Sequence, residues 1–153
     1  MTTSEKISSL SGYEISESNI AWCIETTVDN MSIYVKKHLL KNAKKKSLQN
    51  KQNHFLLYFV ENELKGFLMY RIEKNNVCFI YEIQVARDYQ RQKIGSKLLL
   101  NFLKNMEDIN KIEIFLNVYR SNESAIRFYE AHGFVKDERF NDIKSLIMKH
   151  KHS

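Results

Sequence analysis

The sequence predicts an α/β domain built on a mixed central sheet. In residues 77–85, apolar side chains alternate with other residues at a period of two, which is typical of a strand. From Ile94 onward, Leu98, Phe102 and Met106 recur at four-residue spacing, which is typical of one face of a helix. A further strand follows over residues 111–118, so the strand, helix and strand together indicate a parallel crossover.

The remaining elements follow from the same periodicities. Two helices are expected first, over residues 20–35 and 36–46, and Ser16 to Asn19 offer N-caps for the first. Residues 1–17 are polar and are expected to form an N-terminal arm before a single domain over residues 18–153. The other expected strands cover residues 55–60, 64–73, 77–86, 134–140 and 143–148, and the other expected helices cover residues 94–108 and 122–132.

The chain is organised around the stretch from Tyr81 to Leu100, which reads as a strand, a polar loop and the start of a helix. The first amides of a helix have no internal acceptor, and the helix dipole places partial positive charge there. Arg91 and Lys93 add two full positive charges to this loop. The sequence therefore predicts an anion-binding site, and a diphosphate is the expected ligand.

Composition restricts the class of protein. With 153 residues, 43% of them hydrophobic, the chain is expected to fold as one globular domain. No apolar run approaches the roughly 20 residues of a membrane span, and the N-terminus lacks a signal-sequence pattern. We therefore expect no membrane partner and a cytoplasmic and nuclear location. Cys23 and Cys78 lie among apolar residues without metal-ligand spacing, so we expect reduced core thiols and no metal.

The formal net charge of +6 would suit a polyanionic ligand. A solvated helix face explains much of this charge, and a non-catalytic nucleic-acid-binding module is the alternative. No recognised nucleic-acid-binding motif accompanies the charge, so nucleic acid is not the expected partner. The lysines concerned are Lys36, Lys37, Lys41, Lys44, Lys45, Lys46 and Lys51.

The loop resembles the phosphate-binding signature of the GNAT N-acetyltransferases, Gln/Arg-x-x-Gly-x-Gly/Ala. Gln90 and Gly95 match it, and Lys93 stands where the first Gly is usual. In that family the loop binds the pyrophosphate of acetyl-coenzyme A, so the resemblance implies this cosubstrate. The coenzyme-binding residues that it implies are Gln90, Arg91, Gln92, Lys93, Ile94, Gly95 and Ser96.

A second block, over residues 118–134, is similar to the later GNAT pattern Val-x-x-x-Asn-x-x-Ala-x-x-Phe-Tyr-x-x-x-Gly-Phe. Together the blocks imply a GNAT fold, with a mixed sheet whose parallel strand pair is splayed and flanked by helices. In such a fold the coenzyme arm adds to the opened edge of the strand, at Ile83, Gln84 and Val85. Asn122 is expected to bond the pantetheine arm, or else to cap its helix.

A narrower resemblance is to the NatD enzymes, which acetylate the α-amine of histones that begin Ser-Gly-Arg-Gly. It rests on residues 81–85, Tyr-Glu-Ile-Gln-Val, and on Trp22 with the Asn30-Met31-x-x-Tyr34 stretch. The resemblance implies that the partner is a protein N-terminus, in particular a histone tail, and we expect a monomer. It also implies Tyr34 and Asn117 as acceptor-binding residues. A GNAT enzyme for a small amine or for a lysine side chain remains the alternative.

Amide formation from a thioester needs a neutral amine and a way to release the thiolate. We expect Glu82 to be the general base, because a carboxylate within an apolar strand is unusual; a solvated carboxylate is the alternative. By resemblance, Tyr81 lies beside the incoming amine and Tyr129 protonates the leaving thiolate, although either ring can simply pack. Neither cysteine falls within the catalytic blocks, so direct attack in a ternary complex is expected.

Overall fold

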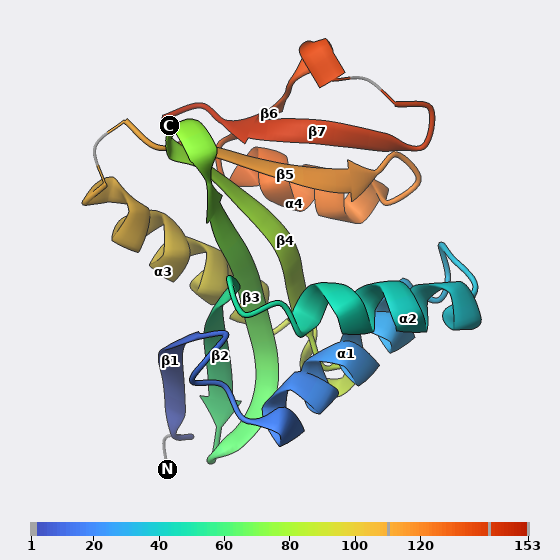
Figure 1. Ribbon diagram of the computed structural model, residues 1–153, viewed down its shortest axis with the longest axis vertical. Coiled ribbons are helices and arrows are strands. Elements are labelled where there is room, and N and C mark those ends of the chain that lie inside the picture. The colour runs from blue at the N-terminus through green and yellow to red at the C-terminus, as the bar shows by residue number, and fades with distance from the viewer. Residues whose placement is uncertain (1–2, 110, 141, 153) are drawn as a thin grey trace.

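The structure, a computed structural model, describes residues 3–109, 111–140 and 142–152. Its centre is a seven-stranded sheet of order β1-β2-β3-β4-β5-β7-β6 (Figure 1). The pair β4 and β5 is parallel and the other neighbouring pairs are antiparallel, which confirms the predicted mixed sheet. The strands are β1 (Glu5–Ser11), β2 (His54–Val60), β3 (Glu63–Glu73), β4 (Val77–Val85), β5 (Glu113–Tyr119), β6 (Phe134–Lys136) and β7 (Ser145–His150).

Within the described residues, four α-helices flank this sheet, close to the positions predicted. Side-chain caps explain where two of them begin: Ser16 accepts the Asn19 amide at 3.1 Å, and Asn122 accepts the Ala125 amide at 3.3 Å. The capping alternative for Asn122 is thus confirmed, while its coenzyme contact stays a prediction. The helices are α1 (Glu17–Met31), α2 (Lys37–Leu48), α3 (Ile94–Glu107) and α4 (Glu123–Ala131).

The two faces of the sheet carry separate apolar cores. On one face, α3 buries Leu98 and Phe102 against the strands, and α4 adds partly buried residues. On the other face, α1 buries Ile20 and Ile24 against β2 and β3, and Leu48 at the end of α2 joins them. Figure 1 shows α3 and α4 set apart from the crossed pair α1 and α2. Any opening in the sheet therefore connects two differently built sides of the molecule.

Two regions differ from the elements predicted. Within the expected arm of residues 1–17, Glu5–Ser11 forms β1, which pairs antiparallel with β2 along the sheet edge. The arm's first two residues lie outside the described chain. Near the other end, the strand expected over residues 134–140 is shorter, because a 3-10 turn over Glu138–Phe140 follows β6.

The sheet opens between its two parallel strands. β4 and β5 pair only through Val77–Ile80 and Glu113–Leu116, and beyond Ile80 the described residues give β4 no partner on that side. The opposite edge of β4 has a bulge at the same point, because Met69 pairs with Glu82 while Tyr70 pairs with Ile80. Tyr81 is the extra residue, and such a bulge bends and twists its strand. The splayed parallel pair is therefore confirmed.

Candidate functional site

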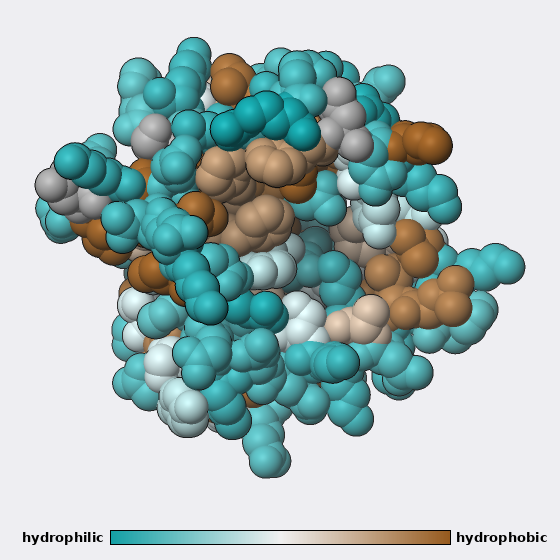
Figure 2. All heavy atoms as spheres, turned by 45° about the horizontal axis from the view of Figure 1, so that its top comes forward, coloured by the Kyte–Doolittle hydropathy of each residue, from teal (hydrophilic) through white to brown (hydrophobic). Residues whose placement is uncertain are grey.

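A cavity of about 400 Å³ lies where β4 and β5 diverge, and we call it the splay pocket. It is lined from both faces of the sheet: Met31 and Lys44 come from α1 and α2, whereas Ala125 and Tyr129 come from α4. Figure 2 shows a largely hydrophilic surface that is hollowed near its centre, below a patch of apolar side chains. The remaining lining residues are Ser47, Phe79, Ile80, Tyr81, Glu82, Ile83, Gln84, Leu116, Asn117, Val118, Tyr119 and Asn122.

Glu82 is the buried carboxylate of the splay pocket. Its side chain is 6% exposed, which excludes the alternative of a solvated strand carboxylate. Both oxygens have partners: Oε2 accepts from Lys44 Nζ at 2.5 Å, and Oε1 accepts from Gln84 Nε2 at 3.0 Å. Gln84 is held in turn by Asn30, whose Nδ2 donates to Gln84 Oε1 at 3.1 Å. Glu82 therefore sits in a fixed orientation, as a group that receives a proton must.

Tyr129 enters the same pocket from α4. Burial, and then the charge of Glu82, raise the pKa of Tyr129, so its hydroxyl keeps its proton far into the alkaline range. Tyr129 also packs against Phe128 and Phe134, so the packing role and a donor role coexist. A protonated hydroxyl in a pocket with a carboxylate gives one group suited to donate a proton and one suited to accept it.

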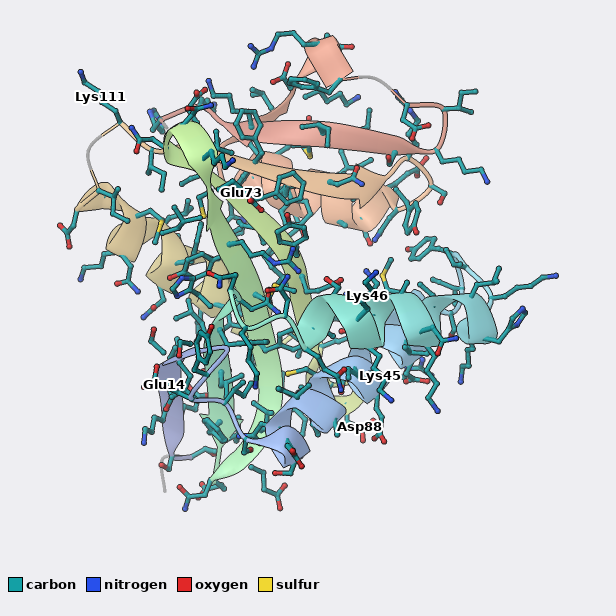
Figure 3. All side chains as sticks on the ribbon, in the orientation of Figure 1. Glu14, Lys45, Lys46, Glu73, Asp88 and Lys111 are labelled. Atoms are coloured by element: carbon teal, nitrogen blue, oxygen red, sulfur yellow. The ribbon has the colours of Figure 1, made fainter. Side chains whose placement is uncertain are left out.

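Tyr81 lies at the bulge, and its ring lines the splay pocket. Its hydroxyl donates to Glu73 Oε1 at 2.7 Å, and the guanidinium of Arg71 lies 4.3 Å from the ring centre. Figure 3 labels Glu73 at the end of β3, away from α1 and α2. Partial burial and the bond to Glu73 raise the pKa of Tyr81. Tyr81 therefore forms a neutral wall of the pocket.

The predicted acceptor-binding residues lie at the β5 side. Asn117 lines the splay pocket, whereas Tyr34 does not. Instead, Tyr34 stacks on Tyr119, with ring centres 5.9 Å apart, and Tyr119 lines the pocket. The connection between α1 and α2 is thus tied by aromatic stacking to β5, beside the opening.

A second cavity, of about 350 Å³, lies over the start of α3, and we call it the loop pocket. Its floor includes Gly95, where an added Cβ would meet Phe128 at an ordinary 3.6 Å. Ser96 Oγ lies 2.8 Å from Nε2 of His132, which joins α3 to the end of α4. The lining residues are Val85, Tyr89, Gln90, Arg91, Lys93, Ile94, Gly95, Ser96, Phe128 and His132.

The backbone of this loop has the shape that a glycine would adopt more readily. Lys93 is the N-cap of α3 with φ 65° and ψ 15°, and Arg91 has φ 66°. Lys93 thus adopts the left-handed conformation despite carrying a Cβ, which answers how the chain accommodates a lysine at the usual glycine position. The turn leads the chain into the first amides of α3, and the two cations flank them.

Three predicted coenzyme-binding side chains are engaged within the protein. Gln84 turns toward Glu82 and Asn30, and Gln90 Nε2 donates to the Val85 carbonyl at 3.2 Å. Gln92 is absent from the loop-pocket lining, and its Nε2 donates to the Asp88 carbonyl at 3.4 Å. These side chains are therefore already hydrogen-bonded within the protein.

Lys44 lines the splay pocket, although its place among the many lysines of α2 suggests a solvated helix face. Its side chain is 24% exposed and ends on Glu82. The signal was present in the sequence: Leu40, Lys44 and Leu48 are spaced by four, and both leucines are buried. Residues at this spacing share one helix face, so Lys44 had to point toward the sheet.

Neither cysteine lines the splay pocket or the loop pocket. Cys23 and Cys78 are buried; burial raises the pKa of both thiols, that of Cys78 to about 12. A thiol with so high a pKa is a poor nucleophile at neutral pH. Among the described residues, no group of three or more His, Cys, Asp or Glu side chains is arranged to hold a metal ion. None of the described helices is long and apolar enough to cross a membrane.

Comparison with known proteins decides the family. Residues 19–134 match the Acetyltransferase (GNAT) family. The chain belongs to this family. The PaiA N-acetyltransferase of Thermoplasma acidophilum, solved in complex with coenzyme A, superimposes with a TM-score of 0.74 at 26% identity, covering 97% of this chain and 99% of the other. The GNAT fold implied by the sequence is thereby confirmed.

Two curated relatives differ in acceptor. The chain is 34% identical over 94 residues to an N-alpha-acetyltransferase of Saccharolobus solfataricus, covering 54% of this chain and 56% of the relative. It is 30% identical over 79 residues to streptothricin acetyltransferase A of Bacillus subtilis, covering 52% of this chain and 46% of the relative. The chain thus spans about half the length of the curated relatives it matches, and the family alone leaves the acceptor open.

Proposed function

We propose that the protein transfers the acetyl group of acetyl-coenzyme A to the α-amine of a protein N-terminus, by direct attack in a ternary complex. The observation that carries this proposal is the splay pocket, which Glu82 and Tyr129 line from opposite faces of the sheet. A thioester arm entering over α4 and an amine entering beside α2 would meet in this cavity. Family membership supports acetyl transfer as the reaction.

The residues present suit the coenzyme. The pyrophosphate would take the amides at the start of α3, with Arg91 and Lys93 neutralising its charge. The pantetheine arm would lie along the open edge of β4, near Ile83, because that edge lacks a β5 partner in the described chain. When bound, the coenzyme supplies an activated acetyl group and a thiolate leaving group.

The chain's own groups then perform the acid–base chemistry. Glu82, directly or through one water, takes the proton of the incoming ammonium and leaves a neutral amine. Tyr129 gives its proton to the departing thiolate, because a tyrosine hydroxyl carries its proton at neutral pH and burial here raises the pKa of Tyr129 further. Direct attack is supported by the two buried thiols, neither of which lines the splay pocket.

An α-amine is the acceptor that a single carboxylate activates most easily. Its reference pKa is about 8, against about 10.4 for a lysine side chain, so deprotonation near neutral pH costs less. The similarity to an N-alpha-acetyltransferase supports the same acceptor. A small amine is the second candidate, and it is favoured by the similarity to streptothricin acetyltransferase A.

One competition experiment separates these acceptors. The protein is incubated with acetyl-coenzyme A and three substrates: a peptide with a free α-amine, the same peptide with its α-amine blocked and an internal lysine added, and streptothricin. Mass spectrometry should find acetylation on the free α-amine. The proposed acceptor would be overturned if the free α-amine stays unmodified while the lysine peptide or streptothricin is acetylated.

The narrower acceptor, a histone tail beginning Ser-Gly-Arg-Gly, is tested by a matched pair of peptides. The second peptide carries Ala in place of the Arg, and kcat/KM is measured for both. A clear preference for the Arg peptide would support a histone tail, whereas equal values would restrict the function to α-amines in general. The expected cytoplasmic and nuclear location and the expected monomeric state stay predictions.

A further inference from the structure

Lys44 is unlike its neighbours on α2. Lys41, Lys45 and Lys46 are exposed, and Figure 3 labels Lys45 and Lys46 on the outer surface of the helix. Lys44 instead shares the inward face with the buried Leu40, and it lines the splay pocket. Its primary amine is therefore held inside the cavity in which acyl transfer is proposed.

The contact that Lys44 makes is the one that an acceptor needs. Its Nζ donates to Oε2 of Glu82, the carboxylate assigned to remove the acceptor's proton. Gln84 occupies the other oxygen of Glu82, so Lys44 holds the oxygen that an incoming amine would have to share or take over. An ammonium group at the base, in a cavity also lined by Tyr129, has the surroundings of a substrate amine.

We propose that Lys44 is an internal acceptor, acetylated on its own Nζ by acetyl-coenzyme A when no other amine occupies the pocket. This inference rests on the proposed site for acetyl transfer. In the step, Glu82 takes one proton from Nζ, the neutral nitrogen bonds to the thioester carbonyl carbon, and the carbon–sulfur bond breaks. The sulfur leaves with a proton from Tyr129. As the amide forms, Glu82 passes its first proton to solvent and takes the second from nitrogen, and Tyr129 regains a proton from solvent, so that one proton is released in all.

The reaction should be slow but selective. An ordinary lysine amine is neutral in only about one molecule in a thousand near neutral pH, whereas an α-amine is neutral in roughly one in ten. Proximity to the thioester offsets this difference, because well-oriented intramolecular groups react as though present at very high concentration. We therefore expect Lys44 labelling in single-turnover amounts over long incubation, in contrast to repeated turnover on a peptide.

Intact and peptide mass spectrometry provide the test. The full chain is incubated with acetyl-coenzyme A alone, and the acetylated fraction is measured at Lys44, Lys45 and Lys46. Lys44 should exceed the two exposed controls by at least about tenfold, and the fraction per protein should not change when the protein is diluted. Labelling that follows exposure, or that falls with dilution, would overturn the proposal.

Two further measurements distinguish reaction within the pocket from a lysine that is reactive by itself. Acetic anhydride, which labels amines by exposure and needs no coenzyme, should reverse the order and favour Lys45 and Lys46 over Lys44. If it also labels Lys44 most, the lysine is intrinsically reactive and the proposal fails. In Glu82→Gln, which retains a side chain of the same size, coenzyme-dependent labelling of Lys44 should be lost; unchanged labelling would overturn the role of the pocket. Circular dichroism checks that this variant is folded.

A parallel incubation with the free α-amine peptide separates this inference from the proposed function. If the peptide is acetylated, and Lys44 is not acetylated in the incubation without peptide, the inference fails and Lys44 is a structural ion-pair partner of Glu82. If Lys44 is acetylated and no peptide or small amine is, the proposed acceptor fails and the inference stands. If neither is acetylated, both fail.

Discussion

Replacing Lys93 by glycine should make the protein more stable, although the change removes a long side chain. Lys93 has φ 65°, and an L-residue in this conformation bears a cost of roughly 1–2 kcal/mol that glycine avoids. Glycine also gains freedom in the unfolded chain, which offsets about 0.5–1 kcal/mol of this benefit. The net expectation is a stabilisation of about 0.5–1 kcal/mol, which raises Tm by about 1–4 °C for a chain of this size.

The assay is thermal and urea unfolding of Lys93→Gly beside two controls. Lys93→Ala removes the same charge but keeps a Cβ, so it isolates the backbone effect and should remain within about 0.5 kcal/mol of the starting protein. Gln92→Gly places a glycine at the adjacent residue, which is not among the positive-φ positions, and should destabilise by about 0.5–1 kcal/mol. If Lys93→Gly is no more stable than Lys93→Ala, the account of this turn is wrong.

Three further predictions concern the site and its supports. Glu82→Gln should lower kcat by about 100- to 10,000-fold without changing the calorimetric Kd for acetyl-coenzyme A; an unchanged kcat would move the base elsewhere. Asn122→Ala should lower Tm by about 2–4 °C through loss of the α4 cap, whereas Asn122→Asp should not, and equal melting of the two would contradict the cap. Burial raises the pKa of Cys78 to about 12 and that of Tyr129 as well, so the folded protein keeps protons that the unfolded chain releases. Between pH 7 and about pH 8 these groups should leave the free energy of unfolding nearly constant, and it should fall as the pH rises past about 8.5, the reference pKa of an unfolded thiol; Tyr129→Phe should flatten the decline above about pH 10, and a rise there would refute the assignment.

The sequence predicted the parts of the fold whose side chains repeat with a clear period. α3 is an example, because Leu98, Phe102 and Met106 recur at four-residue spacing and are all buried. β4 was placed correctly by its alternation, although its buried residues are Cys78, Ile80 and Glu82, which alternate with the apolar set that predicted the strand. β1 was not predicted because this edge strand contributes one residue to each of the two cores. Ile7 packs against the core beneath α3, and Leu10 packs against the core beneath α1. These two residues lie on opposite faces of the strand, so no period-two pattern was available to detect.

The candidate site likewise has a part that could be predicted from the sequence and a part that could not. Residues on β4 and on the loop before α3 could be predicted because the chemistry and the motif are local in sequence. The ion pair between Lys44 and Glu82 joins residues 38 positions apart, and the bond from Asn30 to Gln84 joins residues 54 positions apart. Such contacts depend on how α1 and α2 cross the sheet. Helical spacing indicates only that Lys44 faces inward, not what it meets there.

The short parallel pairing of β4 with β5 has a mechanical consequence. In the described residues, the half-sheet β1–β4 is hydrogen-bonded to the half-sheet of β5, β7 and β6 through no more than the four residue pairs at Val77–Ile80. Rotation of one half against the other would therefore disturb few ladder bonds. A ligand seated across the gap would bridge both halves, so its binding should stiffen the whole sheet, including strands that it never touches.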